Sequence, residues 1–100
     1  MMNKKIKIGV IGCGYWGINL VRNFYELGAL VAVSDTNEEA EKKVKKISKC
    51  ITFNKNYLDL MKSSNIDAVV IATPAKSHYK IVEKALNYNK HVFVEKPLCL

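Results

Sequence analysis

Three glycines follow a run of β-branched residues near the start of the chain, and their spacing constrains the fold more than any other feature. Residues 6–11 are rich in isoleucine and valine, as a buried central strand requires. Gly12, Gly14 and Gly17 then follow the pattern G-x-G-x-x-G. Gly12 allows a tight turn, Gly14 lets a ligand approach the main chain, and Gly17 lets a helix pack closely on the strand. The stretch predicts a strand, a turn and a helix N-terminus, where free N–H groups favour phosphate.

An acidic residue stands where a dinucleotide would need one. Asp35 ends the apolar run Leu30–Ser34 and follows Gly17 at nearly the distance of about 20 residues that the motif requires. A carboxylate there accepts hydrogen bonds from the adenosine ribose and repels a 2′-phosphate. Thr36 and Asn37 supply no arginine to offset that repulsion, so the pattern favours NAD over NADP. The alternative is an ordinary glycine turn without a ligand.

Three other side chains in the turn leave alternatives open. Tyr15 and Trp16 either wall the cofactor or serve as core or interface aromatics. Cys13 is either a small residue at a free position or a reactive thiol, and no neighbouring histidine or arginine favours the thiolate. With Cys50 and Cys99 it makes an odd number of cysteines without metal-ligand spacing. Free thiols in a reducing cytoplasm are therefore expected.

Composition describes a single small globular domain. The chain has 100 residues, 49% of them hydrophobic and 25% charged. Its apolar runs are too short to span a bilayer, and the N-terminus lacks the apolar segment of a signal peptide. The net charge is +7, and five lysines cluster between residues 42 and 49. A solvated helix face is expected there; an anion or nucleic-acid patch is the alternative, and neither nucleic acid nor membrane is expected as a partner.

Strands and helices are expected to alternate along the chain. Strands are predicted at residues 6–11, 30–34, 51–53, 66–72 and 91–94. Helices are predicted at residues 15–27, after a capping box at 36–39, between Asn54 or Asn56 and residues 63–65, and at 78–87 behind a Ser77 cap. Their apolar stripes direct Phe24, Leu27, Ala85 and Leu86 toward a sheet.

This alternation predicts an α/β fold, a Rossmann-type doubly wound parallel sheet with strand order 3-2-1-4-5 and helices on both faces. Ligands bind such sheets beyond the carboxyl ends of the strands, at the switch point between the first and fourth strands. Three stretches converge there: the glycine turn, Thr73-Pro74 and Glu95-Lys96-Pro97.

Those three stretches, with His78 shortly after the second, resemble the N-terminal domain of the glucose–fructose oxidoreductase/inositol 2-dehydrogenase (Gfo/Idh/MocA) family. The resemblance covers essentially the whole chain, and Glu95-Lys96-Pro97 is its most specific part. Within the family, Gly14-Tyr15-Trp16-Gly17 with the following helix is similar to dehydrogenases of UDP-linked amino-sugar uronates.

The resemblance implies a role for each matching residue. Gly12, Gly14 and Gly17 would hold the pyrophosphate and Asp35 the adenosine ribose. Thr73, Pro74 and His78 would lie near the nicotinamide half, and Glu95 near its ribose. Lys96 would reach toward the nicotinamide and the substrate hydroxyl, where its cation can orient the sugar and stabilise developing alkoxide charge. Pro97 would follow a cis peptide bond that fixes the lysine's direction.

Each of these last roles has a plainer alternative. His78 can be a helix residue without a ligand, Glu95 an ordinary strand-end charge and Lys96 a surface lysine. His91 lies at the opposite end of its strand and is expected to be structural.

The family's proteins are about three times as long as this chain, with a second domain that binds substrate. Residues 1–100 are therefore expected to be the NAD-binding domain of a longer, homo-oligomeric sugar, nucleotide-sugar or cyclitol dehydrogenase, inactive alone because substrate positioning supplies much of the rate. A non-catalytic NAD-binding sensor or scaffold module is the competing hypothesis; it needs Asp35 and the glycines but not Lys96. Another nicotinamide oxidoreductase family on the same fold is a second alternative.

Overall fold

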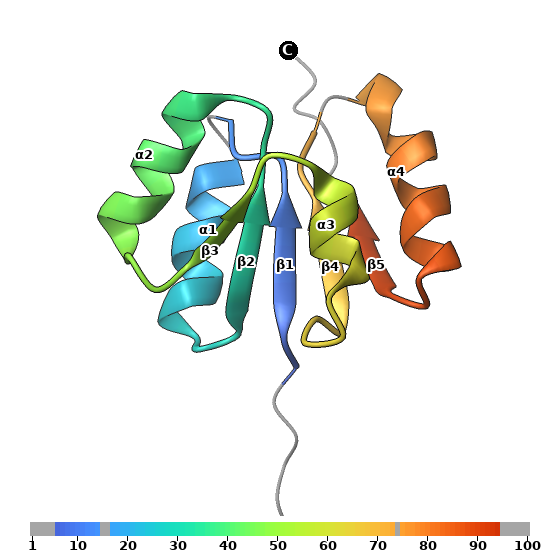
Figure 1. Ribbon diagram of the computed structural model, residues 1–100, viewed down its shortest axis with the longest axis horizontal. Coiled ribbons are helices and arrows are strands. Elements are labelled where there is room, and N and C mark those ends of the chain that lie inside the picture. Colours follow the sequence, from blue (N-terminus) through green and yellow to red (C-terminus); the bar gives the residue numbers. More distant parts are fainter. Residues whose placement is uncertain (1–5, 15–16, 74, 95–100) are drawn as a thin grey trace, which may run out of the picture.

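Strands and helices alternate along the chain in the computed structural model, which describes residues 6–14, 17–73 and 75–94 (Figure 1). The elements are β1 (Ile8–Ile11), α1 (Gly17–Glu26), β2 (Leu30–Ser34), α2 (Glu38–Ile47), β3 (Thr52–Asn54), α3 (Tyr57–Lys62), β4 (Ala68–Ile71), α4 (Ala75–Asn87) and β5 (His91–Val94).

The five strands form one parallel sheet in the order β3-β2-β1-β4-β5, which confirms the predicted topology. β1 is central, and its residues Ile8 to Ile11 pair in register with Ala68 to Ile71 of β4. After β3 the chain crosses the sheet to pair β4 with the free edge of β1, so the direction of winding reverses between these two strands. Both turns that follow them open toward the same edge of the sheet.

Helices cover both faces of the sheet, as expected. Side chains of α1 and α2 pack on one face in a cluster that includes Val10 and Val33, whereas α3 and α4 pack on the other with Ile11 and Val69. Neighbouring residues of one strand therefore enter different halves of the core. β1 and β4 are buried at every position, which explains their nearly continuous apolar sequences.

Asparagines cap two of the helices. The Asn37 side chain accepts a hydrogen bond from Glu39 N at 2.8 Å, and the Asn56 side chain accepts one from Leu58 N at 2.9 Å. Asn56 was one of the two predicted caps of α3. At α2 the predicted capping box is wrong by one position, because Asn37 and not Thr36 is the cap. The helix α4 begins at Ala75, so the prediction that Ser77 caps it is also wrong.

Two leucines predicted to face the sheet are exposed. Leu27 is 73% exposed because α1 ends at Glu26 and the chain turns away through Gly28, whose φ is +74°. Leu86 is 60% exposed, while Ala85 beside it is fully buried. The buried contacts of α4 with the sheet are thus made by Ile81 and Ala85, one helical turn apart, with the partly buried Val82 packed beside them.

Candidate dinucleotide-binding site

A cavity of about 910 Å³ lies over the carboxyl ends of β1, β2 and β4. Its walls come from the glycine turn after β1, the turn after β2 that contains Asp35, the end of β4 with Thr73, and the side of α4. The cavity therefore occupies the switch point at which the sequence predicted a ligand. The cavity is lined both by the glycine turn, where the pyrophosphate is predicted, and by Asp35, where the ribose is predicted.

The structure gives each of the three glycines a different reason to lack a side chain. Gly12 has φ +94°, and a Cβ there would lie 2.8 Å from Thr73 Cγ2. A Cβ on Gly17 would collide with the backbone carbonyl oxygen of Gly12, so this glycine brings α1 close to the end of β1. A Cβ on Gly14 would have no neighbour within 4 Å among the residues that the structure describes, so Gly14 borders open space there. Gly12 and Gly17 are thus required by packing, whereas Gly14 leaves room for something outside the protein.

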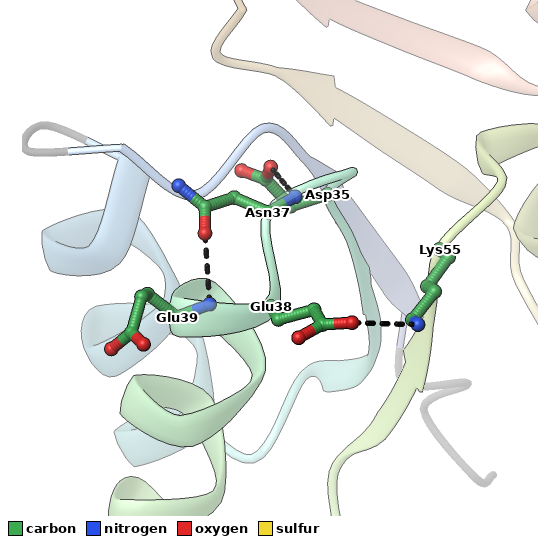
Figure 2. A network of polar contacts seen from close by, with 5 residues as sticks. All are labelled: Asp35, Asn37, Glu38, Glu39 and Lys55. Carbon is green, nitrogen blue, oxygen red and sulfur yellow. Dashed lines mark hydrogen bonds and ion pairs between the residues drawn. The ribbon is translucent and has the colours of Figure 1, made fainter.

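Asp35 lies beside the glycine turn in the wall of the cavity. Its Oδ2 accepts a hydrogen bond from Cys13 N at 2.7 Å. Its Oδ1 accepts one from Asn37 N at 2.9 Å, which Figure 2 shows. A carboxylate offers about four lone-pair positions, so two remain for other donors. Asp35 is therefore both bound within the fold and able to accept hydrogen bonds from a ligand.

Thr73 and His78 meet at the turn after β4. The Nε2 atom of His78 lies 2.6 Å from the carbonyl oxygen of Thr73, and this nitrogen is the donor because a carbonyl only accepts. Thr73 lines the cavity, and its buried hydroxyl has no hydrogen-bond partner among the described residues. An orphaned hydroxyl at a ligand cavity favours a partner supplied by the ligand.

Five predicted site residues, Tyr15, Trp16, Pro74, Glu95 and Lys96, lie outside the described residues, as does Pro97. Their roles stay predictions. Of the predicted site residues that the structure describes, Gly12, Gly14, Gly17, Asp35 and Thr73 line the cavity, whereas His78 is not among its lining residues.

Four lysines that the sequence reasoning did not place in the site also line the cavity: Lys43, Lys55, Lys76 and Lys80. Lys76 and Lys80 are one turn apart on α4, and this i, i+4 spacing just after Thr73-Pro74 was a signal that sequence reasoning missed. Two carboxylates, Asp35 and Glu39, share the lining. Lys55 pairs with Glu38 at 3.4 Å on the exposed rim (Figure 2). Among the described residues the lining thus has more cations than anions, which suits an anionic ligand.

The clustered lysines of α2 have different surroundings: some lie in solvent, one binds a neighbouring loop and one lines the cavity. Lys43 lines the cavity, whereas Lys45 donates to the carbonyl oxygen of Ile51 and so ties the helix to the following loop. Lys42 pairs with Glu39 at 3.5 Å, an exposed pair of small energetic value.

The thiol of Cys13 is buried behind the glycine turn. Burial, and then the negative charge of Asp35, raise the pKa of Cys13 to about 11, while Lys43 lowers it in part. The group is therefore a neutral thiol at physiological pH and a poor nucleophile. Cys50, by contrast, is exposed.

Two negative findings apply to the described ranges 6–14, 17–73 and 75–94. None of their helices has the length and apolarity needed to cross a bilayer. Histidine, cysteine and acidic side chains in these ranges form no group of three that suits a metal ion.

Comparison with known proteins shows the family to which the chain belongs. Residues 6–100 match the family described as "Oxidoreductase family, NAD-binding Rossmann fold" (GFO_IDH_MocA). The chain is 39% identical over 98 residues to the 2,7-anhydro-N-acetylneuraminate hydratase of Escherichia coli (strain K12), covering 95% of this chain and 25% of that protein.

Solved structures are also similar to this chain in fold and in sequence. Scyllo-inositol dehydrogenase from Lactobacillus casei, with bound NAD(H) and scyllo-inositol, superposes with a TM-score of 0.80 at 31% identity, over 94% of this chain and 28% of that one. The WlbA dehydrogenase from Bordetella pertussis, in complex with NADH and UDP-GlcNAcA, gives 0.83 at 29% identity, over 97% of this chain and 30% of that one. The chain thus spans 25% to 30% of these three relatives. From its sequence and its fold, this chain belongs to the Gfo/Idh/MocA oxidoreductase family and forms its NAD-binding Rossmann domain.

Proposed function

We propose that NAD lies along the cavity with its pyrophosphate on the glycine turn and its adenosine ribose at Asp35. The observation that carries this proposal is the open space at Gly14, in a cavity whose other wall holds a carboxylate with free lone pairs. The main chain of the turn and the N-terminus of α1 offer the diphosphate N–H donors and a partial positive charge. The orphaned Thr73 hydroxyl fits a ligand that brings its own hydrogen-bonding groups.

The residues around this cofactor would act by position and charge. Asp35 would accept the ribose hydroxyls, and Thr73, Pro74 and His78 would border the nicotinamide half. Tyr15 and Trp16 would wall the cofactor on the side of the glycine turn. The choice of NAD over NADP rests on Asp35, because a 2′-phosphate would lie against its carboxylate.

For the whole protein we propose hydride transfer between a secondary alcohol of a sugar, nucleotide sugar or cyclitol and NAD. When bound, NAD supplies the hydride acceptor or donor. Lys96 would orient the substrate hydroxyl and take up or release its proton, and Glu95 would contact the nicotinamide ribose. The inositol and UDP-sugar complexes of two structural relatives support this substrate class. Substrate binding would need residues beyond these 100, in a homo-oligomer of the cytoplasm.

A second candidate is a reaction with no net redox change. The relative with 39% identity is named a hydratase, so addition or removal of water at a sugar is compatible with the same domain. The two candidates differ in one measurement: a dehydrogenase accumulates NADH absorbance in proportion to substrate consumed, and a hydratase does not. A Lys96→Ala variant of the whole protein that keeps NAD binding and loses turnover supports either enzyme. Unchanged turnover in the variant would remove the catalytic role of Lys96, and NAD binding without turnover in the wild-type whole protein would favour the non-catalytic module.

Gly14→Ala tests the cofactor position directly. The added methyl group has open space in the protein, so the variant should fold as the wild type does. Because the diphosphate would occupy that space, calorimetry should show NAD affinity reduced by about tenfold or more, the effect expected when overpacking costs about 1–3 kcal/mol. Wild-type affinity in Gly14→Ala would place the pyrophosphate elsewhere, and no heat with NAD in the wild type would remove the proposal.

A further inference from the structure

One carboxylate joins the two turns that form the walls of the cavity. Asp35 Oδ2 accepts a hydrogen bond from Cys13 N, 22 positions earlier in the glycine turn, at 2.7 Å. Asp35 Oδ1 accepts one from Asn37 N at 2.9 Å, at the start of α2 (Figure 2). Each oxygen thus holds a different segment of backbone.

The hydrogen bond from Cys13 N to Asp35 extends the pairing of β1 with β2 beyond their last backbone hydrogen bond. The last backbone hydrogen bond between the ends of β1 and β2 runs from Gly12 N to Ser34 O, at 2.8 Å. Gly12 then turns the chain out of the sheet with φ +94°. On the other side, the backbone N–H of Asp35 already donates to the carbonyl oxygen of Asn54, the last residue of β3. The side chain of Asp35 therefore takes over the link to the glycine turn from the point where the sheet stops.

We propose that Asp35 is a positioning residue for the phosphate-binding turn in addition to its part in ribose recognition. This inference rests on the proposed function, because the turn is taken to bind the pyrophosphate. A hydrogen bond from a backbone N–H to a carboxylate is short and strong, and this one is partly buried. It holds Cys13 in the conformation that places Gly14 beside the open space. Loss of the carboxylate should therefore weaken even a ligand without ribose hydroxyls.

Electrostatics alone predicts the opposite result. Removing Asp35 takes a negative charge away from an anionic diphosphate, which should strengthen binding of that ligand. 2′,3′-Dideoxy-ADP lacks the ribose hydroxyls that would contact Asp35. If Asp35→Ala binds it more weakly than wild type does, the cause is the glycine turn, which has lost its support.

The test compares ADP with 2′,3′-dideoxy-ADP by calorimetry on the purified wild-type protein and on Asp35→Ala, Asp35→Asn and Asp67→Ala. Dideoxy-ADP should bind Asp35→Ala about tenfold more weakly than wild type, the loss expected for a hydrogen bond to a charged group. Asp35→Asn should recover most of that loss, because its amide oxygen still accepts the Cys13 N–H. Asp67→Ala is the matched control: Asp67 Oδ2 accepts Lys7 N at 3.0 Å at the opposite edge of the sheet. The affinity of Asp67→Ala for dideoxy-ADP should stay within about twofold of the wild-type value.

Hydrogen–deuterium exchange measured by mass spectrometry gives a second reading that needs no ligand. The amide of Cys13 should exchange about tenfold faster in Asp35→Ala than in wild type. Unchanged exchange there, wild-type affinity of Asp35→Ala for dideoxy-ADP, or an equal loss in Asp67→Ala would each overturn the inference. Equal binding of ADP and dideoxy-ADP to the wild type would instead remove the proposed ribose contact and leave the positioning role in place.

Discussion

The imidazole Nε2 of His78 donates a hydrogen bond to the carbonyl oxygen of Thr73 at 2.6 Å, joining the first turns of α4 to the end of β4. This bond makes His78 a support for the Thr73 turn, which borders the cavity. The His78 ring and the carbonyl lie five positions apart, so the contact depends on the helix starting as early as Ala75.

His78→Ala should lower the free energy of unfolding by about 1 kcal/mol, the usual cost of one intramolecular hydrogen bond. NAD affinity should fall with it, since the Thr73 turn loses its support. Urea unfolding and calorimetry measure the two effects. The control is His91→Ala, an exposed position at the opposite end of the sheet, which should change stability by no more than about 0.5 kcal/mol. Full stability with strongly reduced NAD affinity would indicate that His78 touches the cofactor directly.

Gly17→Ala should damage the fold rather than the ligand site alone. The added Cβ meets the backbone oxygen of Gly12, which cannot move without displacing the turn. A loss of about 1–3 kcal/mol or more in the free energy of unfolding is expected for such overpacking. Chemical denaturation compares it with Gly14→Ala, whose stability should match wild type. Equal stability of the two variants would contradict the close packing of α1 on β1.

Cys13 should resist alkylation in the folded protein. Its pKa of about 11, raised by burial and by Asp35, leaves very little thiolate at pH 8, and the side chain is only 2% exposed. Iodoacetamide labelling followed by peptide mass spectrometry should modify the exposed Cys50 at least about tenfold faster, because only the thiolate reacts. Denaturant should abolish the difference. Comparable labelling of both sites in the native protein would show that the glycine turn opens.

The same shift predicts the pH dependence of stability. The pKa of Cys13 in the folded protein lies above the 9.0 of a thiol in water, so the native state favours the neutral thiol. This contribution is complete below pH 9 and is lost as the pH rises toward about 11. Cys13→Ala should therefore lose less stability than wild type between pH 9 and 11, as measured by urea unfolding at each pH. Parallel pH profiles would contradict a buried, neutral Cys13.

Lys80→Gln should weaken NAD binding by up to about fivefold, the range expected for a screened cation at an exposed site. The effect should shrink as salt is added, because the Debye length falls to about 3 Å at 1 M salt. Calorimetry at low and high salt measures both. Lys62→Gln is the matched control, since Lys62 is an exposed lysine at the end of α3 and not on the cavity wall. An equal effect of both variants would show that Lys80 acts only through the overall positive charge of the surface and not through its place on the cavity wall.

Much of the site could be predicted because its parts are local in sequence. The spacing of Gly12, Gly14 and Gly17 predicts a tight turn, an approach for a ligand and close packing of a helix. Asp35 follows a recognisable strand. The strand order could be predicted because parallel strands joined by helices accept few arrangements. Errors fell at helix ends: Leu27 has the right spacing for α1 but follows its last residue, and Leu86 adjoins the buried Ala85 yet faces solvent.

The contacts that build the site could not be predicted in the same way. Cys13 and Asp35 are 22 positions apart, and nothing in either neighbourhood indicates that the carboxylate would bind the N–H of the turn. Lys43 and Lys80 belong to different helices and meet only across the cavity.

The order of residues by itself determined the alternation of strand and helix, the glycine turn and the acidic residue beside it, because these depend on backbone freedom and on apolar periodicity over short distances. Only the tertiary structure decided which side chains share the cavity wall and which hydrogen bonds hold its turns. Those relations depend on how β1, β2 and β4 bring distant loops to one edge of the sheet, and that proximity arises when the sheet assembles.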